Sequence, residues 1–159
     1  MSKKKIMPVL LGAIIIGGGF LGYEFLLSDR ADSPFMFQPE NTAVVMQGKI
    51  VYAEHCASCH GENLEGEANW RQRKPSGRLP APPHDETGHT WHHADKSLFN
   101  LTKYGPQYVA GPGYQSDMPA FDGVLSDDEI IAAMSFIKST WSARERQAQD
   151  EITGNSVIN

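Results

Sequence analysis

Two cysteines and a histidine form the group of residues with the clearest chemistry in this sequence. They lie in the run Cys56-Ala57-Ser58-Cys59-His60. Cys-x-x-Cys-His is the attachment sequence of c-type haem, in which each cysteine adds across a haem vinyl group and the histidine binds the iron. We therefore predict one haem c, covalently bound through Cys56 and Cys59, with His60 as its proximal ligand.

Two other interpretations of the Cys-x-x-Cys spacing require different surroundings. A zinc site needs a second pair of ligands at metal spacing, which the remaining histidines could supply. A redox dithiol usually opens a helix after a strand in a βαβ unit, whereas this motif closes a predicted helix and no strand precedes it. The chain has only two cysteines, three positions apart, so a long-range disulfide is impossible. The haem remains the leading prediction.

The start of the sequence has the pattern of a membrane anchor. Lys3, Lys4 and Lys5 precede the uncharged run 6–23, which approaches the roughly 20 residues that cross the hydrocarbon core as a helix. Because the lysines stay cytoplasmic, the pattern predicts a single pass through the cytoplasmic membrane with the haem domain on the outer, periplasmic face. The alternative is a cleaved signal peptide, although its apolar region would be long and no clean small-x-small cleavage site follows.

Composition and charge exclude one class of partner. The chain has 15 Gly and 10 Pro, which indicates a loop-rich fold that depends on more than a protein core, such as a large apolar cofactor. Its formal net charge is −5. Without residues 1–27, 11 basic and 18 acidic residues remain, which gives −7. Such a surface repels phosphates, so no nucleic-acid partner is expected.

A predicted helix leads into the Cys-x-x-Cys-His motif. Asn41 or Thr42 can cap its start, and it runs to about His55. Apolar residues in helical register on it are Ala43, Met46, Ile50 and Ala53. Residues 61–94 and 105–123 show no apolar period and are predicted to be loops.

Two further helices are predicted, and no convincing strand, so the fold class is mostly α. One covers residues 95–104 and stops at Gly105. The last begins with a capping box between Ser126 and Glu129 and ends near Arg144 or Arg146. Its apolar face consists of Ile130, Ala133, Met134, Ile137 and Trp141. The predicted organisation is an anchor at 1–27, a linker at 28–40, a haem domain at 41–146 and a flexible polar tail at 147–159.

Over residues 41–142 the sequence resembles the class I c-type cytochromes. Gly48 and Tyr52 stand at four-residue steps before Cys56, Gly61 follows the motif, and a Met-Pro pair and a closing aromatic helix come later. Residues 70–95 resemble a membrane-anchored monohaem bacterial subgroup. The resemblance implies a mostly helical fold whose first and last helices cross at close range. Gly48 would permit that approach, with Tyr52, Ala133 and Phe136 at the contact.

The resemblance also implies a partner for the proximal histidine. In this family a proline carbonyl accepts a hydrogen bond from the second ring nitrogen, which fixes the ring. Pro82 is the predicted acceptor in this sequence, and Pro80 is the alternative. Residues that could bond the haem propionates are Trp70, Arg71, Arg73, Arg78, Trp91 and Tyr114.

Met118 is the predicted sixth ligand of the iron, by elimination among six methionines. It lies in a predicted loop 58 residues beyond His60 and precedes Pro119. Met46 lies on the wrong side of the motif, and Met134 points into the core from the last helix. The other three, Met1, Met7 and Met36, precede the domain. The rival is bis-histidine ligation, which would use His84, His89, His92 or His93.

These features predict a one-electron carrier rather than an enzyme, because an iron bound by both His60 and Met118 has no vacant position. A tether to the lipid bilayer would raise its concentration near membrane complexes. Expected partners are a quinol-oxidising complex, a terminal oxidase or a dehydrogenase, and the chain could be a subunit of such an oxidoreductase in a respiratory chain. Two alternatives are a haem sensor or enzyme with open iron, and a copper-handling protein that uses His89, His92 and His93.

Overall fold

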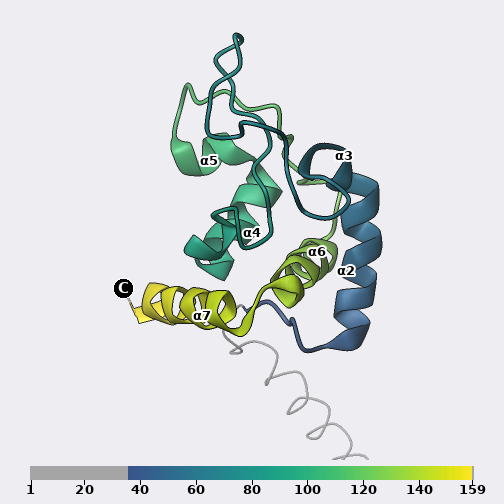
Figure 1. Cartoon of the computed structure of the whole chain (residues 1–159). Helices are drawn as coiled ribbons and strands as arrows, with labels where there is room; N and C mark the ends of the chain where they lie inside the picture. Colours follow the sequence, from purple (N-terminus) through teal and green to yellow (C-terminus); the bar gives the residue numbers. More distant parts are fainter. Residues whose placement is uncertain (1–35, 159) are drawn as a thin grey trace, which may run out of the picture. The chain divides into compact units, whose positions relative to one another are not determined.

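The structure is a computed structural model that describes residues 36–158. In this range the chain forms helices and loops, without a strand (Figure 1), which confirms the mostly α prediction. The elements are α2 (Thr42–His55), α3 (Ala57–His60), the short 3₁₀ helix η1 (Thr90–His92), α4 (Asp95–Tyr104), α5 (Pro106–Ala110), α6 (Asp127–Thr140) and α7 (Ala143–Ile158). No helix in the described range has the length and apolar character to span a membrane. The predicted anchor at 1–27 lies outside the described residues.

Helix α2 starts and ends where the sequence predicted. The Asn41 side chain accepts a hydrogen bond from the backbone N–H of Val44 at 3.4 Å, and the helix ends at His55, directly before Cys56. Its buried residues are Gly48, Val51 and Tyr52. The stripe in helical register, Ala43, Met46, Ile50 and Ala53, is instead exposed, with Met46 at 66% and Ile50 at 60%. The apolar period therefore does not mark the packed face of this helix.

The contact between α2 and α6 explains the orientation of α2. A Cβ atom added to Gly48 would lie 1.9 Å from the backbone oxygen of Ala132, so only glycine allows the two backbones to come this close. One turn further on, the rings of Tyr52 and Phe136 meet with centroids 5.4 Å apart. The predicted close crossing is therefore present, with Ala132 rather than Ala133 against the glycine. Because Gly48 must face α6, the apolar stripe turns to solvent.

Helix α6 has the predicted start and the predicted apolar face. The Ser126 hydroxyl accepts from the Glu129 N–H, and the Glu129 carboxylate accepts from the Ser126 N–H at 2.8 Å. The helix ends at Thr140, earlier than predicted. All five residues of the predicted face are buried, namely Ile130, Ala133, Met134, Ile137 and Trp141.

A further helix, α7, replaces the predicted flexible tail, so that prediction is wrong. Helix α7 continues to Ile158, and Gln149 in it is 0% exposed. The Gln149 side-chain amide donates to the Asp95 carboxylate and, at 3.1 Å, to the backbone oxygen of His93. Lys138 places its Nζ 3.6 Å from the same carboxylate. Helix α7 is thus anchored by buried polar groups, which leave no apolar period in the sequence.

The described end of the predicted linker also packs on the domain. Phe37 is buried, and its N–H donates to the Asp95 carboxylate at 2.6 Å. The N–H of Gln38 donates to the Ser135 hydroxyl at 2.9 Å. Residues 36–40 are therefore held against α4 and α6, so the haem domain begins before the predicted boundary at 41.

Candidate haem site

The Cys-x-x-Cys-His motif lies at the junction of α2 and α3. The Cys56 N–H donates to the Tyr52 carbonyl at 2.9 Å, which continues α2 by one bond, and Cys56 then leaves helical geometry before α3 begins. His60 is buried at the end of α3, Cys56 is half-buried and Cys59 is exposed. All three line a cavity of about 570 Å³, a volume typical of ligand sites. The local fold thus presents the three motif side chains to one space.

The His60 ring is fixed by a proline carbonyl. Its Nδ1 lies 2.8 Å from the backbone oxygen of Pro82, the contact that the resemblance implied, while Pro80 only lines the cavity. A carbonyl can only accept, so Nδ1 carries the proton and Nε2 keeps its lone pair for a metal. Burial lowers the pKa of His60, although the hydrogen bond to the Pro82 carbonyl acts in the opposite direction. The lowered pKa favours the neutral ring that a metal needs.

A second histidine stacks on the first. The ring of His84 lies 4.0 Å from that of His60, centroid to centroid, at an angle of 23°. Its Nδ1 is 2.8 Å from the Thr90 hydroxyl, and its carbonyl accepts from the Trp141 indole N–H at 2.7 Å. Burial lowers the pKa of His84 well below its ordinary value. A ring stacked beside His60 lies on the proximal side, so this position argues against His84 as the ligand from the opposite side.

Met118 lines the same cavity as His60. It is half-buried against the hydrophobic core, and its N–H donates to the Ser116 hydroxyl at 3.0 Å. Met134 also lines the cavity, but it is fixed in α6 with its sulfur 3.9 Å from the Thr102 hydroxyl. Met46 is exposed on α2. The loop methionine therefore remains the predicted distal ligand.

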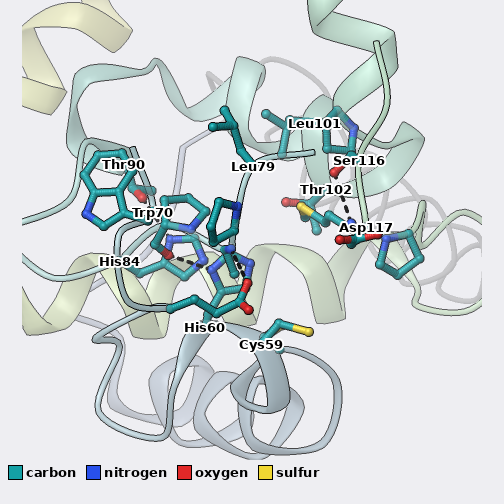
Figure 2. Close-up of a pocket in the computed structure, with 18 of the residues that line it drawn as sticks. Cys59, His60, Trp70, Leu79, His84, Thr90, Leu101, Thr102, Ser116 and Asp117 are labelled. Carbon is teal, nitrogen blue, oxygen red and sulfur yellow. Dashed lines mark hydrogen bonds between the residues drawn. The ribbon is translucent and has the colours of Figure 1, made fainter. Parts of the chain in front are cut away.

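The wall of the cavity is mainly apolar. Figure 2 shows Cys59 and His60 toward one side of it and Leu101 and Ser116 toward the other. Several wall residues could not be predicted from the sequence, because helix α4 and loop 111–125 meet only in the fold. The apolar wall includes Leu79, Leu98, Leu101, Phe121, Leu125 and Ile137. An apolar space with two cysteines and a histidine at its edge fits a haem ring.

The candidate propionate partners divide into two groups. Trp70, Arg71 and Tyr114 line the cavity. The others have partners elsewhere: Arg73 donates to the Gly77 carbonyl, Arg78 to Asp117, and Trp91 to the Glu86 carbonyl.

The histidine-rich loop does not form a metal centre in the structure. Trp70 stacks on His89 with ring centroids 5.3 Å apart, and Trp91 stacks on His92 at 3.6 Å. His93 meets His89 edge to face. In residues 36–158 no three His, Cys, Asp or Glu side chains lie close enough to hold a metal ion. The structure therefore gives no support to a copper or zinc site at His89, His92 and His93.

Burial raises the pKa of the Cys56 thiol to about 11, and the nearby Cys59 adds to the effect. In the absence of a bound group the Cys56 side chain is therefore a neutral thiol at neutral pH.

Together, the motif on one wall, the proline-bound histidine and the apolar cavity define a domain that binds haem covalently. The model of the cytochrome c family matches residues 45–141, and the chain belongs to this family. Its cofactor is haem c, bound through Cys56 and Cys59.

A curated relative is the cbb3-type cytochrome c oxidase subunit FixP of Bradyrhizobium diazoefficiens. It is 23% identical over 114 residues, which is 70% of this chain and 36% of the relative. The chain thus spans about a third of the length of this relative. No solved structure matches the chain.

Proposed function

We propose that this cytochrome c is a one-electron carrier in which His60 and Met118 are the two axial ligands of the haem iron. The observation that carries the proposal is that both side chains line one cavity, although they come from segments 58 residues apart. The haem supplies the reversible Fe(III)/Fe(II) change. A Met/His pair raises the reduction potential relative to bis-histidine ligation.

The protein groups around the cavity have distinct tasks in this proposal. Pro82 holds the His60 ring in the tautomer that leaves Nε2 free. Leu98, Leu101 and Phe121 keep water from the ring. Cys59 is exposed, so it would hold its side of the haem near the surface, where a redox partner could approach.

We also propose that the domain is tethered to the periplasmic face of the cytoplasmic membrane and serves a respiratory oxidase. The three N-terminal lysines before the uncharged run 6–23 support the tether. The relative named as an oxidase subunit supports a terminal oxidase as partner. The test is fractionation: the haem protein should stay with membranes after a salt wash, and a soluble form that begins after Leu27 would contradict the tether.

The axial ligands are tested by spectroscopy. A thioether ligand gives ferric haem a weak near-infrared band, and this band should be present in the unaltered protein. Met118→His should abolish the band and lower the potential in a redox titration, because imidazole stabilises Fe(III) better than a thioether does. Met118→Ala should open the ferrous iron to carbon monoxide.

Exchange of His89 or His93 for alanine should leave the near-infrared band in place, which makes these variants the matched controls. Rapid binding of carbon monoxide by the unaltered ferrous protein would contradict the proposal and indicate a sensor or an enzyme.

A further inference from the structure

One loop contacts both sides of the haem cavity. This loop, residues 66–83, is called the strap loop here. Near its end, Pro82 accepts the hydrogen bond from His60. Further back, Arg78 donates to the Asp117 carboxylate at 2.5 Å, and the Nζ of Lys74 lies 3.7 Å from the same carboxylate. Asp117 directly precedes Met118 in the chain, and Figure 2 shows it at the cavity.

A tight turn directs the side chains of Lys74 and Arg78 toward the carboxylate of Asp117. The Lys74 N–H donates to the Arg78 carbonyl, and the Gly77 N–H donates to the Lys74 carbonyl, both at 2.8 Å. Gly77 has φ +82°, which L side chains rarely adopt, so glycine allows this turn to close. The side chains of Lys74 and Arg78 leave from the two ends of the turn and meet at one carboxylate.

Glu67 connects this turn with the proximal side of the cavity. Its carboxylate lies 3.1 Å and 3.2 Å from the Nζ of Lys74. One of its oxygens also accepts from the Ala81 N–H at 2.6 Å, next to Pro82. A continuous series of polar contacts therefore connects Pro82, which accepts from His60, with Asp117, which precedes Met118.

The segment that carries Met118 has few other polar attachments. In the described part of the chain, no residue from 112 to 120 except Asp117 forms a hydrogen bond or ion pair with a residue more than three positions away. After this segment, the Phe121 and Asp122 N–H groups donate to the carbonyl of Lys103 at 3.0 and 2.9 Å. Asp117 is thus the polar anchor nearest to the methionine.

We infer that Asp117 is a positioning residue for Met118, and that the strap loop sets both axial ligands of the iron through Pro82 and through Lys74 and Arg78. The inference rests on the proposed function, since it takes Met118 as the distal ligand. An outside ligand must displace Met118, and the Met118 segment moves more easily when Asp117 is released. Removal of the two surface ion pairs of Asp117 should strengthen binding of an outside ligand about fivefold.

The experiment is an imidazole titration of the full-length ferric holoprotein in detergent, followed by loss of the near-infrared band. Asp117→Asn should lower the dissociation constant about fivefold. The control is Asp127→Asn, which removes the same charge from another surface pair, with Lys103 at 2.6 Å, and should match the unaltered protein. Added salt should strengthen imidazole binding to the unaltered protein but not to Asp117→Asn, because salt screens exposed ion pairs.

A second variant, with Lys74 and Arg78 both changed to glutamine, should reproduce the effect of Asp117→Asn and should not add to it. Equal dissociation constants for Asp117→Asn and Asp127→Asn, with the near-infrared band present, would overturn the positioning role alone. If Met118→Ala binds imidazole no more tightly than the unaltered protein does, Met118 is not the ligand, and both the inference and the proposed function are wrong.

Discussion

The close crossing of α2 and α6 should tolerate no side chain at position 48. Gly48→Ala would place a Cβ 1.9 Å from the backbone oxygen of Ala132 and 3.0 Å from the Cβ of Phe136. Because the nearest atom is a backbone oxygen, it cannot rotate away, and the two helices must move apart by about 1.5 Å to restore ordinary contact, since unbonded atoms sit at about 3.5 Å. Helix separation would also loosen the contact between Tyr52 and Phe136.

The magnitude follows from two opposed effects. Alanine in a helix interior is favoured over glycine by about 1 kcal/mol. Overpacking in a tight contact costs typically about 1–3 kcal/mol and sometimes more, and a backbone clash this short belongs at or above the upper end. We expect Gly48→Ala to lower the free energy of unfolding by about 2 kcal/mol.

The chain offers a matched control at Gly154 in α7, where a Cβ would meet nothing within 4 Å. Gly154→Ala should raise the free energy of unfolding by about 0.5–1 kcal/mol. Both holoproteins are unfolded with guanidinium chloride in detergent and followed by far-ultraviolet circular dichroism and haem absorbance. Equal stabilisation by Gly48→Ala and Gly154→Ala would refute the reasoning, since the crossing would then have room for a methyl group.

Three further predictions concern the cofactor and the polar contacts of the fold. Exchange of both Cys56 and Cys59 for alanine should leave the haem extractable by acid-acetone or absent, whereas the unaltered protein should keep it, because thioether bonds survive denaturation. Lys138→Met should lower the free energy of unfolding by about 3–5 kcal/mol in a urea titration, because it leaves the buried Asp95 carboxylate without its cation. The pKa of Glu129 is lowered mainly by the Ser126 N–H. The contribution of the ionised Glu129 carboxylate to the free energy of unfolding is therefore complete above the ordinary glutamate pKa of about 4.3, and it is lost as the pH falls through the lowered pKa. Unfolding of Glu129→Gln and the unaltered protein at several pH values should show a difference that disappears in acid.

Local signals predicted much of this fold. Helix α4 has the predicted bounds, and the capping box of α6 has both predicted hydrogen bonds, because each depends on residues within one turn of each other. The motif at Cys56, Cys59 and His60 is equally local. The contact of His60 with Pro82 came from the family resemblance, since the two residues are 22 positions apart and the chain between them carries no periodic pattern that would place the proline.

The features that the sequence did not predict depend on contacts between distant segments. The stripe with Met46 and Ile50 has the period of a packed face. It is exposed because Gly48, on another face of α2, must lie against α6. Helix α7 has no apolar period because Gln149 anchors it through amide hydrogen bonds. The ion pair between Arg78 and Asp117 joins two predicted loops 39 positions apart. Charge in a loop is most often solvated, so sequence alone gives no ground for pairing these two residues.

The polar cluster at Asp95 connects parts of the haem domain that are distant in the sequence. Asp95 accepts from Phe37 at the start of the described residues and from Gln149 in the last helix, and it pairs with Lys138 of α6. A buried carboxylate is tolerable only when its partners are all in place. Phe37 is thus held by the same carboxylate as α7, so the loss of one partner of Asp95 would disturb α4 and α6. Helix α4 supplies Leu98 and Leu101 to the haem cavity. The Asp95 cluster is therefore structurally coupled to the wall of the haem site.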